Sequence, residues 1–382
     1  MKQNFIKSLC LIFAVMFIIS CISANEVSAE IEADAKSLIL IEAFTGKVLY
    51  ENNADERLPP ASVTKVMTML LVMEAVDEGV ISLSDTVTVS ENAASMGGSQ
   101  IYLEVGEQMS VEDMLKSVVV SSANDAACAL AEFVAGSETE FVSRMNSRAA
   151  ELGMVNTKFE NTNGLDDSTV EHLTTARDIA IMSAELITKH PKILEYSTIW
   201  QDTVRNGEFT LSNTNRLIRF YNGANGLKTG STSKAKFCIS ASAKRDGMQL
   251  IAVVMGSSTR DNRNATAKAL LDYGFANYSY ACFEGKNDLS IKVNKGMTNS
   301  VGLSFSDFNA VVKKESADKI EVVTVLPESV NAPVKKGEAI GKVIYTLNGE
   351  TIGESEILAL DDITEITFSE MMKRLLKNFI LI

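Results

Sequence analysis

Three short motifs that could together activate a serine hydroxyl occur in order along the chain. In a helical segment residues i and i+3 share a face, so the hydroxyl of Ser62 and the amine of Lys65 can touch. A serine hydroxyl is a poor nucleophile until a neighbouring base takes its proton, and a lysine can be that base only when burial or a nearby cation lowers its pKa. Lys228 is the candidate cation. The motifs are SVTK at 62–65, SAN at 122–124 and KTG at 228–230.

Each motif is weak when taken alone, and their conjunction carries the argument. Ser-x-x-Lys also begins at Ser231, Ser233 and Ser316, and Ser-x-Asn also occurs at 90–92. Ser62 differs because it follows two prolines, at 59 and 60, and precedes a segment whose apolar residues recur with helical spacing. At such a helix start, unpaired backbone N–H groups point outward and could bind an oxyanion.

The segments around the motifs predict an α+β fold in which helices cover an antiparallel sheet. Residues 37–50 are expected to form a hairpin, and 236–243 and 248–255 two strands joined by Asp246-Gly247. Helices are expected from residue 62 to Gly79, in two segments within 110–135, at 174–188 with Thr174 as its cap, and at 262–276. We therefore predict one domain over residues 30–278.

The composition changes after this domain. Short alternating runs between 288 and 360, with Asn348-Gly349 as a hairpin signal, predict a small β-sandwich-like domain at 285–363. Residues 366–382 predict a basic amphipathic helix, too short to span a bilayer but suited to lie on a membrane surface. The alternative is a helix packed on the protein. In both cases the apolar face of the predicted helix comprises Phe368, Met371, Met372, Leu375, Leu376 and Phe379. The basic residues Lys373, Arg374 and Lys377 lie off that face.

The N-terminus predicts secretion. Lys2 and Lys7 precede an apolar run at 8–20, and small residues follow, so residues 1–29 are expected to be a signal peptide. An uncleaved membrane helix and lipidation at Cys21 are the alternatives. We expect an extracytoplasmic protein attached to the outer face of the cytoplasmic membrane.

Composition excludes other classes of function. The net charge of -13 leaves no basic excess to pair with phosphates, so no nucleic acid is expected as a partner. After removal of residues 1–29, three cysteines remain, which is not a disulfide framework. His172 and His190 are the only histidines, and no Cys/His cluster has metal-ligand spacing. We expect no metal and no cofactor.

The motif set resembles that of penicillin-binding proteins and class A β-lactamases. The chain is most similar to the D-alanyl-D-alanine carboxypeptidases, the low-molecular-mass penicillin-binding proteins. The resemblance implies a β-lactamase/transpeptidase-like domain followed by a small β domain and an amphipathic tail. It covers most of residues 35–280, through the stretches PPASVTKVMT (59–68), SSANDAACALAE (121–132), Phe159 to Asp178, NGLKTGSTSKA (225–235) and LIAVVMG (250–256).

The resemblance also implies catalytic roles. Ser62 would attack the D-Ala–D-Ala carbonyl, and Lys65 would take its proton. Ser122 would relay a proton toward the leaving amine. Asn124 would bind the substrate amide and steady Lys65.

The KTG motif and a downstream arginine would bind substrate. Lys228 would add positive charge, and Thr229 beside Gly230 would help to hold the terminal carboxylate. The backbone N–H groups of Ser62 and Ser231 would form the oxyanion hole, although many relatives have histidine where Ser231 stands. Arg263 would bind the carboxylate directly or indirectly, with Arg260 as its rival.

The function that follows is removal of the terminal D-alanine from peptidoglycan stem pentapeptides, with β-lactam antibiotics as acylating inhibitors. A D,D-endopeptidase of the same fold is one alternative. A class A-like β-lactamase is another, but Glu171 is followed by HLTT, which lacks the asparagine of that family's Glu-x-x-Leu-Asn loop. A non-catalytic wall-binding protein is disfavoured because the serine and lysine positions are intact.

Overall fold

The computed structural model describes residues 31, 33–167 and 169–380, without the side chains of 378–380. Residues 34–382 form the second of two units of the chain. The predicted signal peptide and Cys21 lie outside the described residues. Every element below belongs to the second unit.

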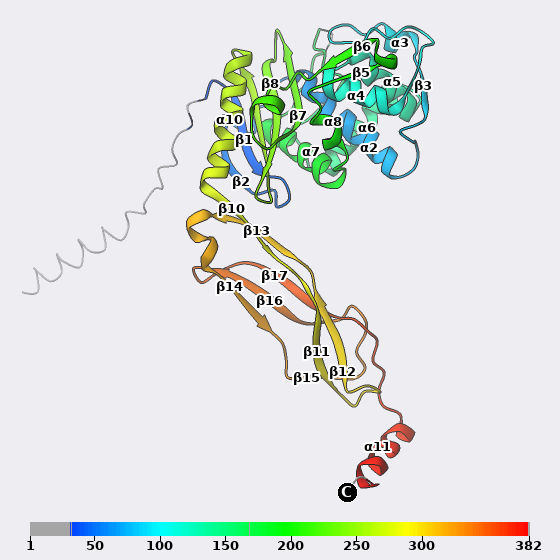
Figure 1. Cartoon of the computed structure of the whole chain (residues 1–382), viewed down its shortest axis with the longest axis vertical. Coiled ribbons are helices and arrows are strands. Elements are labelled where there is room, and N and C mark those ends of the chain that lie inside the picture. The colour runs from blue at the N-terminus through cyan, green and yellow to red at the C-terminus, as the bar shows by residue number, and fades with distance from the viewer. Residues whose placement is uncertain (1–30, 32, 168, 381–382) are drawn as a thin grey trace, which may run out of the picture. The chain divides into compact units, whose positions relative to one another are not determined.

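A five-stranded antiparallel sheet with the strand order β2-β1-β9-β8-β7 forms the centre of residues 34–277 (Figure 1). The turn that joins β8 to β9 has positive φ at Asp246 (48°) and Gly247 (80°), as a two-residue hairpin requires. Both predicted hairpins are therefore confirmed. The strands are β1 (Ser37–Glu42), β2 (Val48–Asn52), β7 (Ala224–Thr232), β8 (Lys236–Arg245) and β9 (Met248–Ser257).

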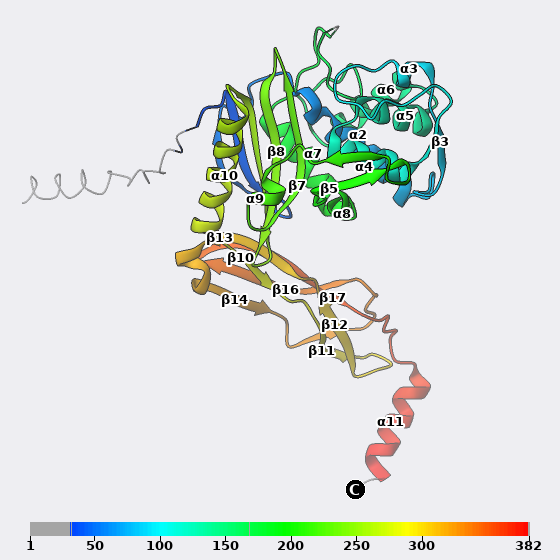
Figure 2. The same ribbon diagram turned by 45° about the horizontal axis from the view of Figure 1, so that its top comes forward.

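Helices cover both faces of this sheet, so its central strands are buried on both sides (Figure 2). Helix α10 (Arg260–Asn277) covers one face, and a Cβ at Gly274 would lie 2.5 Å from Leu250 Cδ1, so glycine permits this close approach. Helix α7 (Ala176–Lys189) covers the other face. It is capped by Thr175, one residue after the predicted Thr174.

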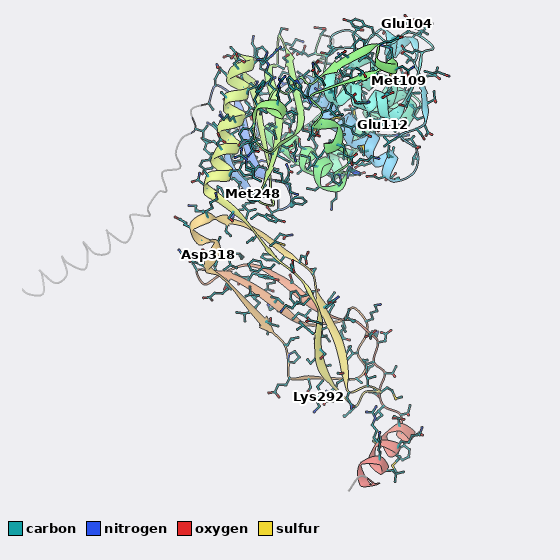
Figure 3. The ribbon with its side chains drawn as sticks, viewed as in Figure 1. Glu104, Met109, Glu112, Met248, Lys292 and Asp318 are labelled. Atoms are coloured by element: carbon teal, nitrogen blue, oxygen red, sulfur yellow. The ribbon has the colours of Figure 1, made fainter. Side chains whose placement is uncertain are left out.

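Further helices pack behind α7 around the main apolar core. Ser110 caps α4 as predicted, since its side chain accepts a hydrogen bond from Asp113 N. Glu112, labelled in Figure 3, lies in the first turn of α4, where a carboxylate complements the helix dipole. These helices are α2 (Lys65–Asp77), α3 (Glu91–Ala94), α4 (Val111–Ser121), α5 (Asn124–Ala135), α6 (Glu138–Glu151), α8 (Ile193–Ser197) and α9 (Leu217–Phe220).

Two short antiparallel strand pairs, which the sequence did not predict, complete this region. Strand β3 (Thr86–Thr88) pairs with β4 (Gln108–Ser110), and β5 (Gln201–Val204) pairs with β6 (Phe209–Ser212). Both are short and lack long apolar alternation, so their pairing depends on the elements they pack against.

Residues 278–366, here the β region, form a separate set of strands with its own apolar core. Six strands pair in the order β14-β16-β17-β12-β11-β15, and β10 pairs with β13. Asn348 (φ 53°) and Gly349 (φ 84°) form the predicted hairpin turn. The strands are β10 (Tyr278–Phe283), β11 (Lys286–Asn294), β12 (Ser300–Phe305), β13 (Phe308–Lys313), β14 (Ile320–Val325), β15 (Ser329–Asn331), β16 (Ala339–Leu347) and β17 (Glu350–Ala359).

The predicted C-terminal helix is present as α11 (Phe368–Ile380). Arg374 donates hydrogen bonds to the carbonyls of Gly296 and Met297 and to Asn299 Oδ1. Among the described residues, no helix has the length and apolar character needed to cross a bilayer. The exposed apolar side chains of α11 are Phe368, Met371, Met372, Leu375 and Leu376.

Candidate active site

Ser62 and Lys65 lie on a tight helical turn. The chain enters α2 through a 3₁₀ turn at Ala61–Thr64, whereas the sequence predicted a continuous helix. With three residues per turn, side chains i and i+3 line up in a 3₁₀ helix more closely than in an α-helix. Lys65 Nζ consequently lies 3.0 Å from Ser62 Oγ.

The Lys65 amine is completely buried and faces three oxygen atoms. Besides Ser62 Oγ, these are Asn124 Oδ1 at 2.6 Å and the Asn163 carbonyl at 2.8 Å. Burial first, and then the charge of Lys228, hold the pKa of Lys65 well below its usual value. A neutral amine has two N–H donors and one lone pair. In that form, donation to Asn124 and Asn163 would leave the lone pair for the Ser62 hydroxyl.

The second motif connects α4 to α5. Ser122 ends α4 in the left-handed conformation (φ 64°), and Asn124 begins α5. The Asn124 amide nitrogen donates to the Gly97 carbonyl at 2.7 Å, which turns its oxygen toward Lys65. The motif thus joins the two helical segments that were predicted within 110–135.

The third motif lies on β7, directly beside the Ser62 turn. A Cβ at Gly230 would lie 2.8 Å from both Pro60 O and Ser62 N, so only glycine allows the strand this close. Lys228 is buried, and its Nζ donates to the Thr229 carbonyl at 2.9 Å. Burial, and secondarily the charge of Arg263, lower the pKa of Lys228 to about 7. Strand β7 thus brings a cation and the backbone around Ser231 to the nucleophile.

A cavity of about 340 Å³ opens onto Ser62. Of the predicted residues, Ser122, Thr229, Gly230, Ser231 and Arg263 also line it, while Lys65, Asn124 and Lys228 are buried behind its wall. The sequence prediction missed Ser99, Trp200, Asn213, Thr214 and Arg216. They lie on loops and short elements without a motif, and the one available signal was that Trp200 is the chain's single tryptophan.

Both arginines that competed for the carboxylate role line this cavity. Arg263 is 3% exposed, and its guanidinium donates to Asn264 Oδ1, at 3.1 and 2.9 Å, and to the Cys238 carbonyl at 3.4 Å. Burial, followed by the charge of Arg260, lowers the pKa of Arg263 to about 10, so it stays protonated at neutral pH. Arg260 lies at the start of α10 on the cavity wall.

His172 supports the Ser62 turn from behind, a role that the sequence did not reveal. Its Nδ1 accepts from Glu160 N at 3.0 Å, so Nε2 carries the proton that is donated to Thr64 Oγ1 at 2.7 Å. Thr64 in turn donates to the Ala61 carbonyl at 2.8 Å. Burial lowers the pKa of His172 to about 4, so the ring stays neutral at neutral pH.

The structure contains no alternative catalytic apparatus in its described part. Glu171, the residue nearest in sequence to a deacylating glutamate, pairs with Lys158 near the surface and does not line the cavity. No group of three His, Cys, Asp or Glu side chains among the described residues could hold a metal ion. Cys128 and Cys238 are buried free thiols, and Cys282 is an exposed one.

Comparison with known proteins identifies the family. A family model described as D-alanyl-D-alanine carboxypeptidase matches residues 23–259, which include all three motifs. The chain belongs to the D-alanyl-D-alanine carboxypeptidase family. A second model, penicillin-binding protein 5, C-terminal domain, matches residues 283–365 within the β region. Arg263 lies beyond the first match.

The similarity to individual proteins extends over nearly the whole chain. The chain is 44% identical over 354 residues to D-alanyl-D-alanine carboxypeptidase DacF of Bacillus subtilis (strain 168), covering 91% of this chain and 90% of that one. The crystal structure of penicillin-binding protein 5 from Haemophilus influenzae matches with a TM-score of 0.76 and 34% identity, covering 87% and 98%. Penicillin-binding protein D2 of Listeria monocytogenes, in an ampicillin-bound form, matches with a TM-score of 0.59 and 32% identity, covering 64% and 99%. The predicted α+β, penicillin-binding-protein fold is confirmed.

Proposed function

We propose that this chain is a serine-type D-Ala-D-Ala carboxypeptidase that removes the terminal D-alanine from peptidoglycan stem pentapeptides through an acyl-enzyme on Ser62. The observation that carries the proposal is the buried Lys65 amine, whose donors are taken by Asn124 and Asn163 while it touches Ser62 Oγ at 3.0 Å. This arrangement prepares Lys65 to accept the serine proton. The endopeptidase and β-lactamase alternatives are not favoured.

Acylation follows from this geometry. As Ser62 Oγ attacks the carbonyl of the D-Ala–D-Ala bond, its proton passes to Lys65, and the carbonyl oxygen becomes an oxyanion facing the backbone N–H groups of Ser62 and Ser231. As the C–N bond breaks, Ser122 passes its proton to the leaving nitrogen and takes the proton held by Lys65 in exchange, so that both residues end the step neutral. Free D-alanine departs, and the rest of the peptide remains as an ester on Ser62.

Deacylation reverses the proton path. Water adds to the ester carbonyl and gives a proton to Lys65, and the C–O bond to Ser62 breaks as the serine oxygen takes a proton back. During acylation, Lys228 and Arg263 supply positive charge near the terminal carboxylate, and Thr229 lines the same wall.

Release of D-alanine tests the proposal. The purified chain should release D-alanine from diacetyl-lysyl-D-Ala-D-Ala. Ser62→Ala should abolish release because, among the described residues, Ser62 carries the hydroxyl that is hydrogen-bonded to the Lys65 amine. Ser231→Ala serves as the matched control, since it removes a hydroxyl from the same cavity but keeps the backbone N–H. Undiminished release by Ser62→Ala would refute the assignment.

The same serine should be acylated by β-lactam antibiotics. Relatives from Listeria monocytogenes have been crystallised in ampicillin- and cefotaxime-bound forms. Release from Ser62 should be slow because Glu171 is paired with Lys158 away from the cavity and cannot activate water there. Fluorescent penicillin should therefore label Ser62 and persist. Rapid turnover of the label would indicate a β-lactamase instead.

We further propose that residues 1–29 direct export and that α11 attaches the protein to the membrane surface. Its apolar side chains are exposed, from 40% at Met372 to 74% at Phe368, as expected of a helix that buries one face in lipid. Deletion of residues 366–382 should abolish co-sedimentation with anionic lipid vesicles, and Leu375→Glu should weaken it. Continued binding after the deletion would implicate the N-terminus or Cys21.

A further inference from the structure

A second hollow, of about 640 Å³, is formed by two segments that also line the catalytic cavity. One is the loop that runs on from Ser99, and the other is the β5–β6 hairpin, which begins just after Trp200. Ser99 and Trp200 line the cavity around Ser62, and the far parts of the same two segments line the hollow. The lining of the hollow includes Tyr102, Glu104, Val105, Arg205, Glu208 and Phe209.

Tyr102 is held in a backbone conformation that a tyrosine rarely adopts. Its φ of 59° is left-handed, which costs free energy for a side chain of this size. The completely buried Asp125 carboxylate fixes the conformation, because it accepts hydrogen bonds from the N–H groups of Ile101 and Leu103 on either side. Arg205 donates to the carbonyls of Ile101 and Tyr102, at 2.7 and 3.2 Å. The tyrosine ring is 68% exposed, so these bonds hold a strained backbone without burying the side chain.

The hollow combines aromatic rings with unpaired carboxylates. The rings of Tyr102 and Phe209 meet edge to face, with centroids 6.3 Å apart. Among the described residues that line the hollow, Arg205 is the one cation, and it is paired with a neighbouring glutamate. Within the described part of the chain, no hydrogen bond or ion pair occupies the carboxylates of Glu208 and of Glu104, which is labelled in Figure 3. The hollow therefore carries a net negative charge.

These groups match the chemistry of a sugar ring. The face of an aromatic ring carries partial negative charge, and the C–H bonds of a sugar are polarised by its oxygen atoms, so an apolar face of the sugar stacks on the ring. The hydroxyl groups of the sugar can donate to the unpaired carboxylates. An anionic polymer or lipid headgroup would be repelled by the same carboxylates. The ligand that fits is an uncharged carbohydrate.

The substrate of the proposed reaction can bring such a ring to this place. Tyr102 is three residues from Ser99, so their Cα atoms are at most about 11 Å apart. Four residues of a stem pentapeptide lie between the bond that is cut and the glycan, which allows a reach of about 14 Å. We propose that the hollow around Tyr102 binds a sugar ring of the peptidoglycan glycan, so that the enzyme prefers stem peptides that are still attached to sugar. This inference rests on the proposed carboxypeptidase function and names a further part of its substrate.

Turnover of two matched substrates tests the proposal. One is a pentapeptide ending in D-Ala-D-Ala and attached to the disaccharide of N-acetylglucosamine and N-acetylmuramic acid. The other is the same pentapeptide with an acetyl group in place of the sugars. We expect kcat/KM to be about threefold to tenfold higher for the sugar-bearing substrate, through a lower KM, as stacking on one ring allows. Equal values would overturn the proposal and leave the carboxypeptidase assignment in place, whereas turnover of neither substrate would overturn both.

Substitutions of Tyr102 locate the preference. Tyr102→Ala should raise KM for the sugar-bearing substrate until the two substrates are equal, with little change for the free pentapeptide. Tyr102→Phe keeps the ring and should keep the preference. Phe44→Ala is the matched control, since Phe44 is also an exposed aromatic side chain (52%) but lines a different hollow. A preference that survives Tyr102→Ala, or one that is lost in Phe44→Ala, would overturn the proposal.

Tyr102→Gly separates binding from folding. Glycine adopts the left-handed conformation without strain, so the Tm of this variant should be at or above that of Tyr102→Ala. The glycine variant should nevertheless show no preference for the sugar-bearing substrate, because it lacks the ring. A preference retained in the glycine variant but lost in the alanine variant would show that alanine acted by disturbing the loop, and would overturn the proposal.

Discussion

The region that holds the site (34–277) and the β region (278–366) bury different kinds of side chain. The first completely encloses charged groups, including Lys65 and Asp125, and nearly encloses Lys228 and Arg263. The described core of the β region is apolar, with Ser355 as its one buried side chain classed as polar. Burying a charge costs free energy, and in this region most of these charges surround the Ser62 hydroxyl, where the reaction uses them. Asp125 instead accepts the backbone N–H groups of Ile101 and Leu103.

The same comparison separates activity from stability. In the first region, a buried lysine destabilises the fold and yet supplies the base. In the β region, the stacked rings of Phe308 and Tyr345, with centroids 4.1 Å apart, stabilise the fold and have no chemistry to perform. Substitution of the buried lysine should therefore lower activity without lowering stability. Substitution in the stacked ring pair should lower stability without lowering activity.

The largest effect is expected from Lys65→Met. Loss of the base should lower kcat/KM by about 10³-fold or more. Because methionine is apolar and of similar length, the free energy of unfolding should stay the same or rise. D-alanine release and thermal unfolding measured on one preparation check both halves. A clear loss of stability would show that the buried lysine supports the fold.

The opposite pattern is expected from Tyr345→Ala in the β region. Removal of this buried ring should lower the free energy of unfolding by about 3–5 kcal/mol, with kcat/KM unchanged in the folded protein. Tyr345→Phe is the matched control. The hydroxyl is buried without a partner among the described residues, so its removal should stabilise the fold by about 1 kcal/mol. Denaturant titration measures both, and a destabilised Phe variant would contradict the comparison.

A pH profile should show the charge of Lys228. Its pKa is about 7, so the free enzyme loses this cation as the pH rises through that value. Because the cation attracts the substrate carboxylate, kcat/KM should fall above pH 7, at most about tenfold per pH unit. Lys228→Arg keeps the charge and should flatten that limb, whatever its absolute rate. An unchanged alkaline limb in this variant would assign it to another group.

The same lysine makes stability depend on pH. Its folded pKa of about 7 lies below the value of about 10.4 in an unfolded chain. Between these values the unfolded state binds more protons, so the free energy of unfolding should rise with pH across this window. Lys228→Met should reduce that slope, which denaturant titrations between pH 7 and 10 would measure.

The smallest effect is expected from Lys342→Ala in the β region. Lys342 pairs with Glu354 across neighbouring strands at 2.9 Å, and both side chains are 45% exposed. Such a pair contributes about 0–1 kcal/mol and is screened by salt. Arg148→Ala is the comparison in the first region, since Arg148 is 23% exposed and pairs with Glu74, Glu151 and Glu185. Its loss should destabilise the fold more, and equal effects would contradict the expected role of burial.

Many of the predicted turns and helix ends agree with the structure because neighbouring residues in the sequence specify them. Turn residues at 246–247 and 348–349 produced the predicted hairpins, and Ser110 capped the predicted helix. The short β3–β4 and β5–β6 pairs were missed because few residues specify them. The prediction of a continuous helix from residue 62 was wrong, because Ala61–Thr64 form a 3₁₀ turn. Gly164 and Gly230 approach the backbone of this turn closely, and such contacts with distant segments have no local sequence signal.

The sequence by itself determined the serine chemistry of this protein, because the order and spacing of its three motifs are covalent facts. It also determined the amphipathic C-terminal helix, since periodicity is written in consecutive residues. Only the tertiary structure decided the pKa of the base and the charge of the cavity beside the nucleophile. The Lys65 amine is bonded to the carbonyl of Asn163, 98 residues away, and its pKa is lowered by burial and by Lys228 on β7. Arg216, just before α9, and Arg260, at the start of α10, add charge to the cavity. Burial and charge proximity arise from the packing of distant segments, so no local pattern could specify them.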